Sequence, residues 1–262
     1  MEILYGLHPV QEALRAGGRR FEYVCVARER HDQRLSAIVE LCRAAGVKVH
    51  TEPREALSRR AGTTAHQGVV AVVREREFLE AEDLLTGPEP RLVLALDGVE
   101  DPQNLGALLR TAEAAGVDGV LTTERRSAPL TATVAKSSAG ASEHVRIAKV
   151  TNMTRALETL KKAGFWIVGL DERGSPDYTD FSFRGDLCLV LGSEGTGLHD
   201  LVKRTCDHLL RIPMAGSVSS LNVSVAGAVV MFEAMRQRRA ASARPVAAAA
   251  SKKGRPQKGL GS

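Results

Sequence analysis

The chain has 262 residues, of which 44% are hydrophobic and 26% are charged, with a formal net charge of +5. These proportions are typical of a soluble globular protein with one or two domains. The longest apolar runs, such as Val225 to Met235, are too short to cross a bilayer and exclude a membrane-spanning helix. No basic region precedes an apolar run at the N-terminus, so we expect a cytoplasmic protein.

The charges are distributed unevenly along the chain. Residues 1–76 carry 13 basic and 9 acidic side chains. Residues 77–90 carry 5 acidic and no basic side chains, and residues 236–262 carry 8 basic and no acidic ones. This asymmetry suits a polyanionic partner, although basic tails also serve solubility. The four cysteines lack the spacing of a metal site, so neither zinc nor a disulfide is expected.

Residues 1–76 are predicted to form a compact α/β unit. Pro9 is suited to the first position of a helix, and Val10, Ala13 and Leu14 continue it with helical spacing. Further helices are expected over 35–45 and 54–61, and strands over 21–27, 47–51 and 69–73. A polar turn containing His66-Gln67-Gly68 precedes the last of these strands.

Residues 77–90 are rich in acidic residues and proline, which predicts an exposed linker. From residue 91 to 238, strands and helices alternate, which predicts an α/β domain with a mainly parallel sheet and helices on both faces. Residues 239–262 are predicted to be a basic, disordered tail. The expected strands are 92–96, 119–122, 145–147, 165–170, 187–191 and 209–212, and the expected helices are 105–115, 134–139, 153–163 and one after Asn222.

Two loops of small and polar residues follow strands late in the chain. The first is Gly192-Ser193-Glu194-Gly195-Thr196-Gly197, and the second runs from Pro213 to Asn222, where Ser219 or Ser220 suits a helix N-cap. Open α/β sheets bind ligands at the ends of their strands, so we expect a site here. Either loop alone is explained as an ordinary turn. The loop that contains Ser220-Leu221-Asn222 is harder to explain in this way, because it holds five further small residues and no side chain apolar enough to pack.

Two helices carry further signals. In the helix after Asn104, Leu105, Leu108, Leu109 and Ala112 form one buried stripe, with Arg110 opposite and Gly106 and Glu113 beside it. An arginine on a polar helix face is usually only solvated. In the last helix, Val225, Val229 and Phe232 are predicted to face the core, while Val223, Ala226, Val230 and Ala234 form a second apolar strip. A glycine-rich dinucleotide fingerprint is missing after Leu96.

Three motifs resemble those of the SpoU/TrmH class of RNA 2′-O-ribose methyltransferases. They are Asp101-Pro102-Gln103-Asn104-Leu105-Gly106 running to Arg110, Gly192-Ser193-Glu194-Gly195, and Ile212-Pro213-Met214 running to Asn222. The resemblance covers residues 3 to 238. It implies a SPOUT domain with a trefoil knot, S-adenosylmethionine as methyl donor without a metal, and a guanosine in the peptidyl-transferase loop of 23S rRNA as target.

The resemblance also assigns roles to residues. It implies that Asn104, Arg110, Glu194, Ser220 and Asn222 are catalytic, and that Gly192, Ile212, Met214 and Leu221 contact the donor. A guanidinium is nearly always protonated, so we expect Arg110 to hold the target phosphate and stabilise developing negative charge. Glu194 is expected to orient Arg110 or the nucleotide. Gly192 is expected to leave room for the ligand.

The N-terminal unit is similar to ribosomal RNA-binding proteins, which implies RNA contacts at Arg15, Arg19, Arg20, His66 and Gln67. The resemblance further implies a homodimer through the C-terminal domain. The alternatives are an enzyme of the same class acting on tRNA or another rRNA nucleotide, and a non-catalytic RNA-binding or ribosome-assembly protein. A non-catalytic member is expected to have lost Arg110, Glu194 or Asn222, and all three are present.

Overall fold

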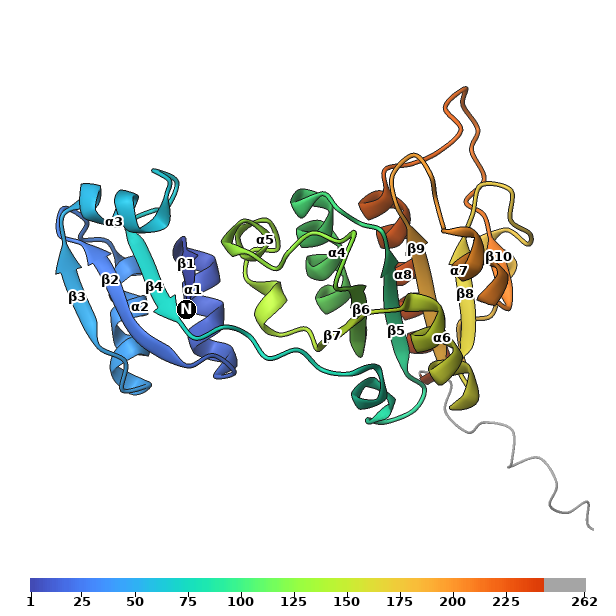
Figure 1. Cartoon of the computed structure of the whole chain (residues 1–262), viewed down its shortest axis with the longest axis horizontal. Helices are drawn as coiled ribbons and strands as arrows, with labels where there is room; N and C mark the ends of the chain where they lie inside the picture. Colours follow the sequence, from blue (N-terminus) through green and yellow to red (C-terminus); the bar gives the residue numbers. More distant parts are fainter. Residues whose placement is uncertain (243–262) are drawn as a thin grey trace, which may run out of the picture.

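The computed structural model describes residues 1–242, which form two sheets with helices between them and around them (Figure 1). The N-terminal sheet has the order β1-β4-β2-β3, with β4 antiparallel to both β1 and β2 and with β3 parallel to β2. Helices α1 and α2 pack on one face of this sheet, and α3 packs on the other. The elements are β1 (Glu2–Tyr5), α1 (Leu7–Ala16), β2 (Phe21–Ala27), α2 (Gln33–Ala44), β3 (Val49–Glu52), α3 (Arg54–Ala61) and β4 (Val69–Val73).

Two features of this unit differ from the sequence prediction. Strand β1 was not expected, and α1 begins at Leu7 rather than at Pro9. The earlier start is stabilised by Gln67, whose Oε1 accepts a hydrogen bond from the Leu7 amide at 3.1 Å. This side chain therefore caps a helix from a loop 60 residues away.

The second sheet is parallel throughout, in the order β10-β8-β9-β5-β6-β7. The predicted α/β class with a mainly parallel sheet is confirmed, whereas the trefoil knot stays a prediction. The strands are β5 (Leu92–Asp97), β6 (Gly119–Thr123), β7 (Ile147–Val150), β8 (Trp166–Leu170), β9 (Leu187–Gly192) and β10 (His208–Leu210).

Helices cover both faces of the parallel sheet. Alternate strand residues point to opposite sides, so Leu94 and Leu189 lie in the core beneath α4 and α8, whereas Val93 and Val190 lie in the core beneath α6 and α7. Within residues 1–242, no helix combines the length and apolar character needed to cross a membrane. The helices are α4 (Pro102–Ala114), α5 (Ala132–Ser137), α6 (Met153–Lys162), α7 (Asp200–Thr205) and α8 (Val223–Ser242), with 3₁₀ turns η1 (Ala81–Leu85), η2 (Ala141–Glu143) and η3 (Tyr178–Asp180).

The prediction of an exposed linker over 77–90 is wrong for its middle part. Leu84 in η1 is fully buried in the core beneath α6. Leu79 extends the sheet edge, because its amide donates to the Ile147 carbonyl at 3.0 Å and its carbonyl accepts from the Lys149 amide at 3.1 Å. The high average charge of the segment conceals these apolar residues, which attach it to the second sheet.

Helix α8 is oriented differently from the prediction. Val225 and Phe232 are 48% and 42% exposed, while the second strip, including Val230 and Ala234, faces the core. Gly227 fixes this orientation, because a Cβ there would lie 2.7 Å from the side chains of both Leu108 and Leu191. A helix with Val and Ala on both sides does not reveal its buried face by periodicity alone.

The predicted disordered tail is also corrected at its start. Residues 239–242 form the last turn of α8, where the Ser242 hydroxyl donates to the Arg238 carbonyl at 3.1 Å. Alanine is the strongest helix former, which explains why the helix continues through Ala240 and Ala241. The rest of the predicted tail, residues 243–262, lies outside the described residues.

Candidate active site

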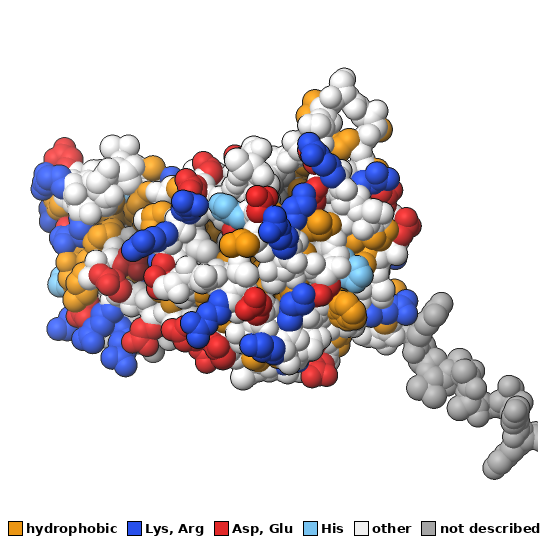
Figure 2. Space-filling model, turned by 45° about the vertical axis from the view of Figure 1, so that its right-hand side comes forward, with side chains coloured by type: hydrophobic (Ala, Val, Ile, Leu, Met, Phe, Trp, Pro, Cys, Tyr) orange, Lys and Arg blue, Asp and Glu red, His pale blue; other side chains and the backbone are white. Residues whose placement is uncertain are grey.

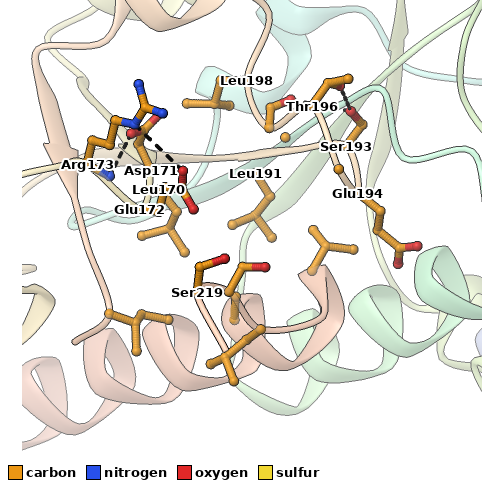
Figure 3. A pocket seen from close by; sticks show the side chains of 18 of the residues that line it. Leu170, Asp171, Glu172, Arg173, Leu191, Ser193, Glu194, Thr196, Leu198 and Ser219 are labelled. Atoms are coloured by element: carbon orange, nitrogen blue, oxygen red, sulfur yellow. Dashed lines mark hydrogen bonds and ion pairs between the residues drawn. The ribbon is translucent and has the colours of Figure 1, made fainter. Parts of the chain in front are cut away.

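A cavity of about 720 Å³ lies at the carboxyl ends of β8, β9 and β10, where the start of α8 closes it (Figure 3). Its apolar floor includes Leu191, Leu210 and Ile212, and its rim carries hydroxyl, amide and carboxylate groups. This is the edge at which parallel sheets usually bind ligands. All four predicted donor-contact residues, Gly192, Ile212, Met214 and Leu221, line the cavity.

The glycine loop after β9 folds back on itself. Ser193 and Gly197 exchange two backbone hydrogen bonds, at 3.0 and 3.1 Å. A Cβ on Gly192 would lie 2.1 Å from the Gly197 carbonyl carbon and 2.3 Å from the Leu198 nitrogen. The expected reason for this glycine, room for a ligand, is therefore corrected: the space is taken by the loop itself.

The three sequence motifs meet in a closed triangle of hydrogen bonds. Asn222 Nδ2 donates to Asn104 Oδ1 and to Glu194 Oε1, each at 3.1 Å. Asn104 Nδ2 also donates to Glu194 Oε1. We call Asn104, Glu194 and Asn222 the motif triangle. Figure 3 shows the Glu194 side chain directed away from the glycine loop, toward the helices that begin at the other two motifs.

Backbone contacts hold the two asparagines of the motif triangle in place. Asp101 caps α4, since its Oδ1 accepts from the amides of Gln103 and Asn104 at 2.7 and 2.8 Å. Asn222 caps α8, since its Oδ1 accepts from the Ser224 amide at 2.9 Å. The expected N-cap, Ser219 or Ser220, is therefore wrong. Asn222 therefore contributes its Nδ2 to the motif triangle, whereas Asn104 contributes both its Nδ2 and its Oδ1.

Arg110 lies outside both the cavity and the motif triangle, on the exposed side of α4. Glu194 contacts the two asparagines, so the expectation that it orients Arg110 is not supported by this arrangement. Gly106 was expected beside Arg110 on the polar face but is buried against α5. A Cβ on Gly106 would lie 1.9 Å from Ser137 Oγ, so only glycine allows the two helices this close.

The loop before α8 projects from the body of the protein (Figures 1 and 2). Ser220 lines the cavity from this loop and is exposed. Three apolar side chains of the loop are also exposed, including Val218 at 69%. Exposed apolar side chains beside a cavity are surfaces that a ligand or a partner is able to cover.

The opposite wall of the cavity was missed by sequence reasoning. Asp171, Glu172 and Arg173 follow β8 and lie across the cavity from Glu194 (Figure 3). Lys203 donates a hydrogen bond to Asp171. Burial alone would raise the pKa of Asp171, but the hydrogen bond and positive charge of Lys203, together with those of Arg173, lower the pKa overall. The available signal was their position directly after a predicted strand, the same signal that marked the glycine loop.

A second unpredicted contact supports the glycine loop from behind. Asp97, buried at the end of β5, accepts from the His199 amide at 2.9 Å and contacts His199 Nδ1 at 3.0 Å. These contacts attach the end of the glycine loop to the central strand. Among residues 1–242, no group of three or more His, Cys, Asp or Glu side chains is arranged to hold a metal ion.

Two of the predicted RNA contacts have structural roles; His66 is buried, whereas Gln67 is exposed and stays a candidate RNA contact. His66 is fully buried, with Nε2 3.0 Å from Ser58 Oγ and Nδ1 accepting from the Gly68 amide at 3.1 Å. Burial, with a smaller effect from nearby Arg54, lowers the pKa of His66. Gln67 caps α1, as described above. The His66-Gln67-Gly68 turn therefore organises the N-terminal unit.

The three predicted arginine contacts are placed differently. Arg20 is exposed, and Arg15 is exposed while paired with Glu12 at 2.8 Å. Arg19 is not available to RNA in this arrangement, because its side chain is only 5% exposed and pairs with Glu2 and Glu143. Sequence spacing alone does not distinguish a buried, paired arginine from a free one.

A parallel sheet with a ligand-sized cavity at its strand ends and three motifs joined beside it define a methyltransferase of the SpoU class. The SpoU rRNA Methylase family matches residues 91–232, and the family described as RNA 2′-O ribose methyltransferase substrate binding matches residues 3–79. The chain belongs to the SpoU rRNA methylase family.

Individual relatives match over nearly their whole length. The chain is 43% identical to the 23S rRNA (guanosine-2′-O-)-methyltransferase RlmB of Vibrio parahaemolyticus, over 92% of this chain and 98% of that protein. It is 42% identical to RlmB of Escherichia coli, over 90% and 99%. The structure of the SpoU methyltransferase AviRb from Streptomyces viridochromogenes in complex with AdoMet superposes with a TM-score of 0.78 at 27% identity, covering 91% of this chain and 90% of that one.

The residues of the cavity fit S-adenosylmethionine as methyl donor. A volume of about 720 Å³ is within the usual range for small-ligand sites, roughly 300–1,000 Å³. The apolar floor suits an adenine ring, and the hydroxyl, amide and charged groups of the rim suit its polar parts. The expected donor is confirmed, while the individual contact residues stay predictions.

Proposed function

We propose that this protein transfers a methyl group from S-adenosylmethionine to the ribose 2′-hydroxyl of a guanosine in 23S rRNA. The relatives named RlmB carry this activity in their names and match 90–92% of this chain. The observation that carries the proposal is the motif triangle, which is intact beside a cavity of the right size. The substrate agrees with the cytoplasmic location expected from the sequence.

In this reaction the chain's own residues fix the cavity wall, orient the ribose, bind an RNA phosphate and offset developing negative charge. When bound, S-adenosylmethionine supplies an electrophilic methyl group on its sulfonium. The motif triangle fixes the wall of the cavity where the ribose has to approach, and so supplies orientation. Ser220 lies in the loop that ends at Asn222 and is placed to orient the ribose. Arg110, as a fixed cation, binds an RNA phosphate and offsets the charge that develops on the attacking oxygen.

The decisive experiment compares ribose methylation in total RNA from cells with and without this protein, read at every 2′-hydroxyl. One 23S guanosine is expected to lose its methyl group, and the intact gene is expected to restore it while an Asn222→Ala gene is not. Loss at a tRNA position instead supports the nearest alternative. An unchanged map, together with no methyl transfer in vitro, supports a non-catalytic RNA-binding protein.

We also infer that the protein is a homodimer that pairs through α8. In residues 1–242, Val225 and Phe232 lie on the same outer side of α8, seven residues apart, and both are among the exposed large hydrophobic side chains. Pairing would remove them from water, which is worth about 25 cal/mol per Å² of apolar surface. The family resemblance implies sites that draw on both copies, and we infer that Arg110, which does not line the cavity of its own chain, serves the cavity of the partner.

Light scattering tests the dimer. At micromolar concentration we expect twice the chain mass of 28.1 kDa, and a monomer for Phe232→Glu. Glu233→Gln on the same helix is the matched control, because among the described residues Glu233 contacts Arg236 and Gln237 of its own helix. Mixing the inactive Arg110→Ala and Asn222→Ala proteins is expected to regain activity if each site draws on both copies. A fully active monomer would refute the proposal.

We assign RNA recruitment to the N-terminal unit, residues 1–76, and keep the exposed residues Arg15, Arg20 and Gln67 as its candidate contacts. The match of residues 3–79 to a substrate-binding family supports this assignment. Phosphate contacts of this kind position RNA without reading its sequence. Arg15→Ala combined with Arg20→Ala is expected to weaken RNA binding at low salt, measured by filter binding, and to leave donor binding unchanged.

A further inference from the structure

The N-terminal unit is packed against its own methyltransferase domain at one defined place. Figure 1 shows α1 and α5 lying between the two sheets. Ala135 of α5 is buried in the hydrophobic core of the N-terminal unit. Gly140 adopts a φ of +88°, and a Cβ there would lie 2.7 Å from the Glu12 Cβ of α1 and 3.1 Å from the His8 carbonyl. A contact this close fixes where α1 sits.

A cluster of ion pairs at the edge of this contact centres on Glu143. Its side chain is 3% exposed and pairs with Arg19 Nε at 3.0 Å and with an Arg76 terminal nitrogen at 2.8 Å. Arg19 also pairs with Glu2 at 2.8 Å, and Arg76 donates to the Ser142 carbonyl at 2.7 Å. Two cations and two anions balance, so the cluster has no net charge to offer to RNA.

A buried ion pair contributes little net stability, because desolvation of the charges offsets their attraction. Its consequence is geometric, since moving either partner leaves a buried charge without a counter-ion. Arg19 and Arg76 lie at the same end of the N-terminal sheet, before β2 and after β4, whereas Glu143 belongs to the methyltransferase domain. The cluster therefore fixes the orientation of one domain on the other.

This fixed orientation continues to the reaction site. Glu143 ends η2, which follows α5, and α5 packs directly on α4 where Gly106 meets Ser137. Ser137 Oγ donates to the Pro102 carbonyl at 3.1 Å, in the turn of α4 that carries Asn104. A continuous series of packed elements thus connects the RNA-binding unit with the motif triangle.

We propose that Glu143 is a positioning residue for RNA methylation: by pairing with Arg19 and Arg76 it holds the N-terminal unit at the distance and angle from the cavity that the RNA substrate requires. The proposal rests on the proposed function, in which RNA bound by the N-terminal unit is methylated at the cavity. It assigns Arg19 to this contact rather than to RNA.

The test is Glu143→Gln in the full chain, assayed with S-adenosylmethionine and a 23S rRNA transcript. We expect the KM for RNA to rise about tenfold, while kcat and the Kd for S-adenosylmethionine stay within about twofold. Glu143→Asp keeps the charge and is expected to restore most of the KM. Glu40→Gln is the matched control, because it removes an exposed pair with Arg43 that lies wholly within the N-terminal unit.

Small-angle scattering supplies a readout that does not depend on activity. A larger radius of gyration is expected for Glu143→Gln than for Glu40→Gln. An unchanged KM and radius in a donor-binding Glu143→Gln protein would overturn the proposal, as would equal loss of kcat and donor binding. If Glu143→Gln does not bind donor, Arg76→Gln is read by the same criteria. A wild-type protein that leaves the transcript unmethylated refutes the proposed function, while the scattering result still decides on the domain contact.

Discussion

Replacing Glu194 by alanine or by glutamine separates two roles for this residue. In the motif triangle, Glu194 Oε1 accepts hydrogen bonds from both Asn104 and Asn222. Alanine removes the acceptor for both amides. A hydrogen bond to a charged group is worth about 1.5–3 kcal/mol, and since the site is open to water we take the lower value for each bond. The loss is about 3 kcal/mol, or on the order of 100-fold in kcat/KM for RNA.

Glutamine keeps an oxygen in the same position and loses only the charge. Both hydrogen bonds then become neutral, at a cost of about 1 kcal/mol in total, so a fall of roughly fivefold in kcat/KM is expected. Methyl transfer to an rRNA transcript measures both variants, and calorimetry with S-adenosylmethionine checks that the fold is intact. If Glu194→Gln is as inactive as Glu194→Ala, the carboxylate acts by its charge or as a base, and the positioning argument is wrong.

Three further predictions use single residues. Arg110→Ala is expected to abolish methyl transfer with the Kd for S-adenosylmethionine unchanged, because Arg110 lies outside the cavity; a fully active variant would remove it from the site. Gly192→Ala places a Cβ 2.1 Å from the Gly197 carbonyl carbon, so calorimetry should find donor binding lost, and unimpaired binding would contradict the loop geometry. Burial lowers the pKa of His66, so the unfolded chain takes up a proton first as the pH falls. The stability that neutral His66 contributes is therefore complete above about pH 6.5 and declines as the pH falls toward and through the folded-state pKa. The Tm of the wild-type protein should exceed that of His66→Gln by less at pH 5 than at pH 7. A difference that does not change with pH would show that His66 is not held neutral.

The sequence predicts elements with strong local signals and places the three motifs at strand ends. Helix α4 shows why this works: the regular stripe of leucines predicts a helix over 105–115. The structure begins this helix three residues earlier, at Pro102, because Asp101 caps it there. The two glycine-containing loops follow apolar strands, which is sufficient to predict a site at the sheet edge. The contact between Asn104 and Glu194, 90 residues apart, is not predicted by the sequence, from which Glu194 is expected to orient Arg110 or the nucleotide.

The errors have a common physical origin in packing between elements. Helix α8 is apolar on both sides, and only the close approach of Gly227 to Leu108 and Leu191 decides which side is buried. The average composition of residues 77–90 predicts an exposed linker, although Ala81 and Leu84 are buried in the core. Arg19 and His66 are expected to contact RNA only from the resemblance to ribosomal RNA-binding proteins, which does not reveal that Arg19 pairs with Glu143 or that His66 contacts Ser58 in the interior.

The separation of the motif-triangle residues along the chain has a consequence for synthesis. These contacts join positions 28, 90 and 118 residues apart, and contacts of long separation form only after the intervening chain is available. The N-terminal unit draws most of its core from residues 4–73 and is complete early, because domains fold in order as they leave the ribosome. A chain that stops before Asn222 and α8 keeps the N-terminal unit, to which we assign RNA recruitment. It lacks Asn222 and the side of the cavity that α8 forms. Such a fragment would occupy RNA without methylating it and would compete with the finished enzyme.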